Sequence, residues 1–400
     1  MDLVHLVGWR VLAGDLLDYV RFRAVCAHWR SSTVCPLGRG IVDPRFHPRR
    51  WMILPEGHGV HPGDGKKRFL NLSTGAFARV RLPLLTEHRV LVSAEGLLLL
   101  GPYSRRDTGT ILILHPFTGD IVKLPPLMPL LESYWAMLPG MGRHYYMQLD
   151  FVASLSVSAD GTVAVMIVHQ YLPCVLFATT KDEQWRASSW DLAPLSRPIS
   201  FQGRLYILTP PATHGSQQLI MLVGPPRHEH ATMPSSLAPP KLIATCPKGK
   251  YHHRLFLIGL AECDSQILAI GFEELRGLFI CKVADLTMGK VSPMPSIGGN
   301  TIFLIERSTR IQSGDIIISR SMTSSCRVMP TVQSDTIVCR RQNYPWQYHL
   351  GTGNCSRIMC GCGVQDGYTI EGGCNCGLIY HIYHCCHCPD DWLSTYVFKV

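Results

Sequence analysis

A short phrase that returns along the chain constrains the fold more than any other feature of this sequence. Two clear copies are Asn71–Gly75, which continues to Leu82-Pro83, and His115–Gly119, which continues to Leu124-Pro125. An imperfect copy is Asp285–Gly289, which continues to Met294-Pro295, and Tyr348–Gly353 is a fourth candidate. We predict that each copy is a strand, a glycine-containing hairpin turn and a second strand, which ends at proline where one is present because proline cannot continue the ladder. The step from Gly75 to Gly119 is close to one propeller blade of about 40–50 residues, so the repeats predict a β-propeller.

The rest of the chain after Trp51 has the same strand-rich character. Short apolar runs such as Leu97–Leu100 alternate with clusters of Gly, Pro, Asp and Ser. We therefore expect a mainly β fold in which residues 36–400 form one propeller, with six to eight blades at about 40–60 residues each. A propeller avoids open sheet edges, so we expect Trp51–Leu54 to share a blade with Leu378–Tyr383 or Leu393–Val400.

Residues 1–35 differ in kind from the rest and predict short helices. Leu3, Leu6 and Val7 share one helical face, and Asp15 has the character of an N-cap. The next apolar positions at helical spacing are Leu16, Leu17, Val20 and Ala24, followed by Val25 and Trp29. About 30 residues are too few to hold a core alone, so we expect these helices to pack on the propeller or on a partner.

The composition excludes several classes of function. The 400 residues carry a net charge of +9, but Lys and Arg are scattered and form no basic tail, which argues against nucleic-acid binding. The first residues, Met1–His5, lack the basic and apolar regions of a secretory signal. The uncharged stretch from Gly161 to Thr180 is interrupted by Pro173, so it predicts two buried strands and no membrane helix. We expect an intracellular protein without a membrane anchor.

No catalytic or cofactor-binding pattern stands out, and the cysteines raise one alternative. Cys360, Cys362, Cys374 and Cys376 form two Cys-x-Cys pairs near more Cys and His, the residue types that bind zinc. Structural zinc sites usually use Cys-x2–4-Cys, so buried thiols are favoured over a metal site. The single Asp107-Thr108-Gly109 predicts a turn, and neither a Gly-x-Ser-x-Gly elbow nor a P-loop is present. We predict a binding protein that is not an enzyme and has no cofactor.

Two parts of the chain resemble a known family. The residues Asp2–Val4, Gly14–Arg21 and Val25–Arg30 resemble an F-box, whose helices end in the signature Val-Cys-x-x-Trp-Arg. The downstream stretches resemble the β-propeller domain of unknown function of a large plant F-box family that is abundant in grasses; they are Asp43–Phe46, Phe69–Leu72, His115–Asp120, Trp185–Leu192, Ile297–Thr301 and Asp335–Val338.

The resemblance implies a substrate receptor of a Skp–cullin–F-box ubiquitin ligase, with residues 1–35 as the F-box-like segment. The residues expected to hold the Skp-type adaptor are Leu3, Leu16, Leu17, Val20, Val25 and Trp29. The propeller would bind a protein target that the sequence does not identify. The Leu-Pro pair that usually opens an F-box is absent before Leu3, and Gly8 weakens the first helix by about 1 kcal/mol relative to Ala. The alternative is a free-standing propeller scaffold or inhibitor that has lost adaptor binding.

Overall fold

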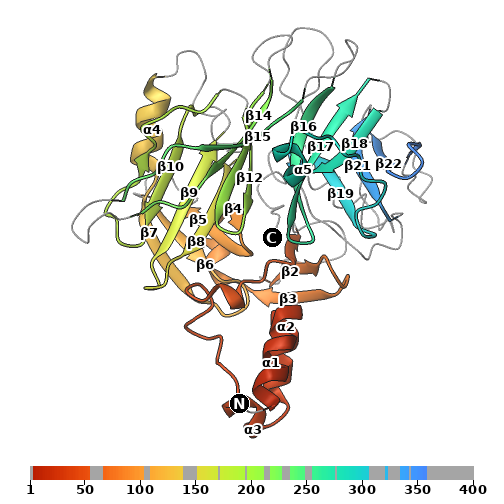
Figure 1. Cartoon of the computed structure of the whole chain (residues 1–400). Coiled ribbons are helices and arrows are strands. Elements are labelled where there is room, and N and C mark those ends of the chain that lie inside the picture. The colour runs from red at the N-terminus through yellow and green to blue at the C-terminus, as the bar shows by residue number, and fades with distance from the viewer. Residues whose placement is uncertain are drawn as a thin grey trace, which may run out of the picture.

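Three helices precede the sheets of the protein. The computed structural model describes residues 3–54, 66–102, 109–137, 151–169, 172–193, 196–210, 217–227, 235–247, 255–274, 277–305, 320–322, 334–341 and 344–357. The helices are α1 (Leu3–Gly14), α2 (Leu16–Ala24) and α3 (Ala27–Ser31). Figure 1 shows them projecting from one side of an assembly of sheets.

The strands of the described residues form six sheets. The first three, in hydrogen-bonded order, are β1 (Trp51–Leu54), β2 (Lys66–Asn71) and β3 (Phe77–Arg81); β4 (His88–Ala94), β5 (Leu97–Pro102), β6 (Thr110–Leu114) and β7 (Ile121–Pro126); and β11 (Arg186–Ala187), β10 (Val175–Thr179), β9 (Val163–His169) and β8 (Phe151–Val157). The others are β12 (Arg197–Phe201), β13 (Arg204–Leu208), β14 (Leu219–Val223) and β15 (Lys241–Thr245); β16 (Leu255–Cys263), β17 (Gln266–Glu273) and β18 (Gly277–Lys282); and β20 (Arg320–Met322), β19 (Thr301–Ile305), β21 (Thr336–Arg341), β22 (Tyr344–His349) and β23 (Cys355–Arg357).

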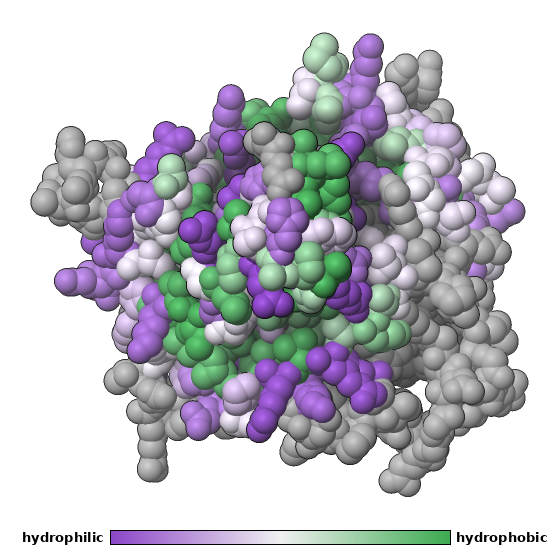
Figure 2. All heavy atoms as spheres, turned by 90° about the horizontal axis from the view of Figure 1, so that it is seen from below, coloured by the Kyte–Doolittle hydropathy of each residue, from purple (hydrophilic) through white to green (hydrophobic). Residues whose placement is uncertain are grey.

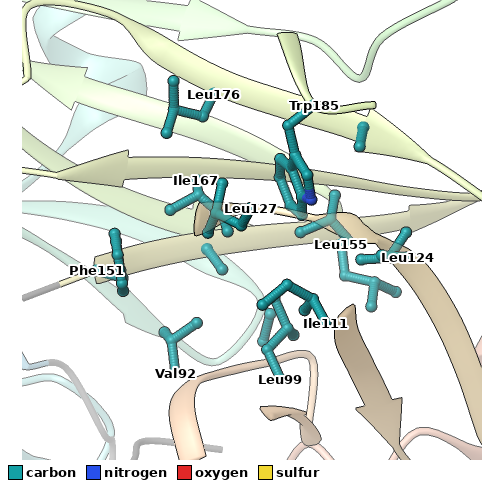
Figure 3. Packing of buried hydrophobic residues seen from close by; sticks show 14 of the residues in the cluster. Val92, Leu99, Ile111, Leu124, Leu127, Phe151, Leu155, Ile167, Leu176 and Trp185 are labelled. Carbon is teal, nitrogen blue, oxygen red and sulfur yellow. The ribbon is translucent and has the colours of Figure 1, made fainter. Parts of the chain in front are cut away.

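Apolar side chains fill the space between each sheet and the next, as they do between the blades of a propeller. One core joins the β4–β7 sheet to the β8–β11 sheet and contains Leu99, Ile167 and Leu176, all fully buried (Figure 3). Similar cores join the other consecutive sheets. The Trp185 indole N–H also donates to the Pro125 carbonyl at 2.8 Å across the first of these cores. The predicted mainly β propeller, preceded by helices, is confirmed.

The repeated phrase forms the same turn in three places, namely Asn71–Gly75, His115–Gly119 and His349–Gly353. In each turn the glycine N–H donates to the carbonyl of the first residue, at 2.8–2.9 Å. The threonine before the glycine accepts a hydrogen bond from the amide two positions later, at 3.3 Å in all three. The glycines have φ of 71°, 76° and 72°, a region that residues with a Cβ rarely adopt. These hairpins are confirmed.

The imperfect copy at Asp285–Gly289 does not form a hairpin, so the hairpin predicted there is wrong. The chain instead forms the short helix α5 (Val283–Thr287) directly after β18, and no strand follows it before β19. Val283 and Leu286 lie three positions apart and are both buried in the core with the β16–β18 sheet. Packing of this helical stripe therefore decides the local structure.

The uncharged stretch from Gly161 to Thr180 contains β9 and β10, as predicted, and nearly every residue of both strands is buried. A further helix, α4 (Met128–Met137), contributes Leu131 to the core beside β8. None of the helices in the described ranges has the length and apolar character needed to cross a membrane. The strands expected to pair with β1, Leu378–Tyr383 or Leu393–Val400, lie outside the described residues, so that pairing stays a prediction.

The helices share a small core with the chain that follows them. Leu12, Leu16, Tyr19 and Phe46 are buried together, and the Tyr19 hydroxyl donates to the Val34 carbonyl at 2.8 Å. Gly8 is buried, and a Cβ there would lie only 2.8 Å from Thr33 Cγ2. The glycine that weakens α1 on propensity alone therefore permits the close approach of α1 to the residues after α3.

Candidate functional site

The six residues predicted to bind an adaptor divide into exposed and packed groups. Leu3, Val20 and Val25 are exposed, at 72%, 42% and 62% of their full accessibility. Leu16 is buried at 4% in the core with Tyr19 and Phe46. The structure therefore turns this last side chain inward, away from the surface.

The other two predicted residues are partly covered by the protein itself. Leu17 is half-buried against the core that includes Trp51 and Phe69. The ring of Trp29 stacks on Phe22, with 4.2 Å between ring centroids. Trp29 is half-buried, so one part of its ring faces solvent while Phe22 covers another.

Two further residues belong with the exposed group. Leu6 and Val7 on α1 are 47% and 40% exposed, and they lie three and four positions after Leu3, on the same face of the helix. The helical spacing of these three residues predicts that they share one face, and the structure shows that this face is exposed. We call Leu3, Leu6, Val7, Val20 and Val25 the helical patch. Figure 2, which shows the molecule from the side of the helices, shows hydrophobic residues gathered among hydrophilic ones on this face.

Asp15 joins the helices to the propeller. Its Oδ1 accepts hydrogen bonds from the amides of Leu17 at 2.8 Å and Asp18 at 3.2 Å, which confirms the predicted N-cap. Its Oδ2 accepts from Trp51 Nε1 at 2.7 Å and from Asn71 Nδ2 at 2.8 Å. One carboxylate thus caps α2 and binds the β1–β3 sheet.

The segment after the helices, residues 36–50, forms a second connection, which we call the linker. The Asp120 carboxylate accepts hydrogen bonds from the amides of Gly38 at 2.9 Å and Gly40 at 2.7 Å. A Cβ on Gly40 would lie 2.5 Å from Thr118 Oγ1, so only glycine fits there. His115 Nε2 is 3.0 Å from the Phe46 carbonyl. The second repeated turn therefore holds the linker in place.

The linker also reaches back to α1. The Arg45 guanidinium lies 4.3 Å from the centroid of the Trp9 ring, a cation–π contact, and forms an ion pair with Asp43 at 2.6 Å. The Arg45 side chain, as a hydrogen-bond donor, lowers the pKa of Asp43.

Two histidines of this junction are held neutral by burial. Burial lowers the pKa of His47 to about 4, although the hydrogen bond between His47 Nε2 and the Ile41 carbonyl opposes the shift. Burial likewise lowers the pKa of His115. A positive charge on either ring would be poorly solvated, so both imidazoles are uncharged at neutral pH.

A shallow groove of about 430 Å³ lies beside the linker. It is lined by Arg39, Val42, Asp43 and Pro44 of the linker and by Val157 at the end of β8 with Ser158 and Ala159 after it. Val42, which lines the groove, is an exposed apolar side chain, as is Leu37 earlier in the linker.

No group of metal-binding residues occurs within the part of the chain that the structure describes. The predicted alternative ligands Cys360, Cys362, Cys374 and Cys376 lie outside it, as do Asp107 and Thr108. Among the described thiols, burial raises the pKa of Cys246 to about 11 and that of Cys281 to about 12. These two thiols are therefore protonated at neutral pH and unreactive.

The solved structures similar to this chain share little sequence with it, and two of them are described as β-propeller domains. They include a nidogen/laminin complex (10% identity, 75% of this chain and 84% of that chain, TM-score 0.30). Also similar are the Swd1 propeller domain of Myceliophteria thermophila (10%, 73% and 76%, TM-score 0.28) and the propeller domain of the trilobed protease of Pyrococcus furiosus (11%, 74% and 75%, TM-score 0.28). No curated protein sequence matches the chain.

The sequence profile of the KIB1-4 beta-propeller matches residues 69–347, which run from β2 to β22 and exceed half of the chain. This type of propeller is typical of plant F-box proteins, is generally non-catalytic and indicates protein binding. The matched region begins after α1–α3, so it does not include the helices. On this match, the chain belongs to the KIB1-4 beta-propeller family.

Proposed function

We propose that this protein is a substrate-recognition subunit of a Skp–cullin–F-box ubiquitin ligase. In this proposal the helices, within residues 1–35, bind the Skp-type adaptor, and the propeller, within residues 36–400, binds a target protein. The observation that carries the proposal is the helical patch, which stands beside a propeller of a family typical of F-box proteins.

The distribution of exposed apolar side chains supports a partner at the helices. Seven of the eleven large exposed hydrophobic side chains among the described residues precede Asp43. Single exposed apolar residues are ordinary, but a cluster of them on one small element is typical of an interaction site. Contact with an adaptor would remove this apolar surface from water.

The connections at Asp15 and Asp120 support the same function. A ligase subunit must present its target at a defined position relative to the adaptor. The Asp15 carboxylate accepts hydrogen bonds from both α2 and the β1–β3 sheet, and these bonds hold the helices in a fixed orientation on the propeller. Assembly into such a ligase would place the protein in the cytoplasm or nucleus.

Binding of the purified chain to a Skp-type adaptor tests the proposal. Val25→Asp, alone or with Leu3→Asp, should weaken binding at least tenfold, because a charge would be buried in the interface. Trp29→Ala should cost about 2 kcal/mol of binding free energy as the loss of a hot spot. Ile121→Asp is the matched control, since Ile121 is 46% exposed on β7 of the propeller, and it should bind like the unmutated chain.

Circular dichroism of each variant checks that the helices still form, which matters most for Trp29 because it stacks on Phe22. If the unmutated chain shows no adaptor binding, the ligase function is wrong. The propeller would then act as a free-standing scaffold or inhibitor.

A further inference from the structure

The two ends of the propeller can be told apart by the direction of its strands. Glu95, just after β4, accepts a hydrogen bond at 3.1 Å from the amide of Gly203, in the turn after β12. The same carboxylate forms an ion pair at 2.7 Å with Arg49 of the linker. The ends of β4 and β12 therefore meet on the helix side. The first residues of these strands, His88 and Arg197, lie at the opposite end.

Among the described residues, Arg197 has a single hydrogen-bond acceptor for its side chain. Its guanidinium donates to the carbonyl of Ile258, the residue at the bulge in β16. The neighbouring Leu257 is already bound on both its N–H and C=O by the Gln218 side chain. A guanidinium has five N–H donors, and among the described residues no carboxylate forms an ion pair with Arg197.

Burial of Arg197 destabilises the positive charge of its guanidinium. Arg197 is half-buried on β12, which packs against β16, and burial lowers the pKa of its guanidinium to about 10. A desolvated charge without a partner destabilises a fold, and an apolar side chain of similar length would serve the packing as well. A cation in such a place is better explained by a partner that supplies the anion.

A second polar group at the same end also lacks a partner. Nδ1 of His88, at the start of β4, is buried without a hydrogen bond in the described part of the structure. Arg89 follows it and adds a positive charge on the same strand. We call Arg89 and Arg197 the far-end cationic group, since they stand at the starts of β4 and β12, away from the helices.

We propose that the far-end cationic group binds a carboxylate-rich segment of a protein partner. The inference rests on the proposed function in one respect, because the segment would belong to the target that the propeller recruits. The guanidinium offers a planar set of donors that matches a carboxylate. Placement at the end opposite the helices leaves adaptor and target free to bind at the same time.

Titration of the full chain with a labelled, capped hexaglutamate peptide tests this inference without any adaptor. We expect binding that weakens as salt is raised from about 50 to about 300 mM. Arg197→Met should weaken binding at least tenfold. Arg204→Met is the matched control, because Arg204 is exposed at the other end of the same blade, and it should bind like the unmutated chain.

Arg197→Lys keeps a charge and a donor for the Ile258 carbonyl, and we expect it to weaken binding severalfold while leaving the melting temperature nearly unchanged. If Arg197→Met does not fold, the peptide affinity of Arg197→Lys tests the proposal instead. Equal peptide affinity in the unmutated chain and in both Arg197 variants would overturn the proposal. So would binding of a single-stranded oligonucleotide of equal charge in place of the peptide. Peptide binding without adaptor binding would retain the far-end site and reject only the ligase.

Discussion

The Asp15 carboxylate accepts a hydrogen bond from the Trp51 indole at 2.7 Å, across the boundary between the helices and the first sheet of the propeller. Asp15 is also the N-cap of α2, and Trp51 is the first residue of β1 and is 3% exposed. The Asp15 side chain therefore caps the start of α2 and accepts the hydrogen bond of a buried indole N–H in the first blade. The helical segment and the propeller should unfold together rather than as separate units.

Replacement of Asp15 tests this coupling. Asp15→Ala removes the N-cap, which is worth about 1 kcal/mol, and leaves the Trp51 and Asn71 donors without their acceptor, at about 1–3 kcal/mol. We expect the free energy of unfolding to fall by about 3 kcal/mol, measured by urea denaturation with both helical and tryptophan signals. Asp18→Ala is the control, since its ion pair with Arg21 is exposed and should contribute under about 1 kcal/mol. Two separate transitions in the unmutated chain would show that the units are independent.

The linker should tolerate no side chain at Gly40. Gly40→Ala would place its Cβ 2.5 Å from Thr118 Oγ1 and 2.9 Å from Asp120 Oδ2, and so force apart the bond between Asp120 and the Gly40 amide. Overpacking of this kind costs about 1–3 kcal/mol. Gly224→Ala is a matched control, because a Cβ there meets nothing within 4 Å. Melting temperatures of the two variants provide the comparison, and equal values would contradict the steric argument.

The propeller could be predicted from sequence because its repeated turns depend on local chemistry. Gly75 and Gly119 supply the positive φ, and the threonine before each glycine binds a nearby amide. Asp285–Gly289 carries similar letters, but the buried stripe of Val283 and Leu286 makes it a helix. The sequence of the repeated phrase does not reveal whether the local turn or the packing of an apolar helical stripe is the more stable. That balance depends on packing against a sheet formed by other parts of the chain.

The candidate site could be predicted only in part, for a related reason. Helical spacing placed Leu3, Leu6 and Val7 on one face, but spacing does not say whether that face is covered. Leu16, which the resemblance assigns to adaptor binding, is buried, because Phe46, thirty positions further on, packs in the same core. The bonds from Asp120 to Gly38 and Gly40 join residues so distant in sequence that no local pattern signals them.

Closure of the propeller ring depends on the strand that pairs with the free edge of β1. Within the described residues β1 pairs with β2 on one side only. We predict that Leu378–Tyr383 or Leu393–Val400 pairs with its other edge. In a chain that ends at Gly373, the amides of Trp51–Leu54 that point away from β2 should therefore exchange with deuterium much faster than in the full chain. Unchanged exchange of these amides would show that the β1 edge is protected by other means.

Protonation of His47 should destabilise the protein in mild acid. Its pKa is lowered to about 4 in the folded protein by burial, whereas an unfolded chain has the ordinary value of 6.5. Between these values the unfolded state binds more protons, so the stability from His47 is complete above pH 6.5 and falls as pH decreases toward 4. The lowered pKa of His115 acts in the same direction.

At 1.36 kcal/mol per pKa unit, His47 alone should make the protein about 2–3 kcal/mol less stable at pH 4.5 than at pH 7.5. His47→Gln removes the titrating group while its amide N–H can still donate to the Ile41 carbonyl, as Nε2 of His47 does. Urea denaturation at both pH values should show that the difference shrinks by this amount in the variant. Because carboxylates elsewhere titrate equally in both proteins, their contribution cancels in the comparison. An undiminished difference in His47→Gln would mean that the imidazole becomes charged in the folded protein as readily as in the unfolded chain.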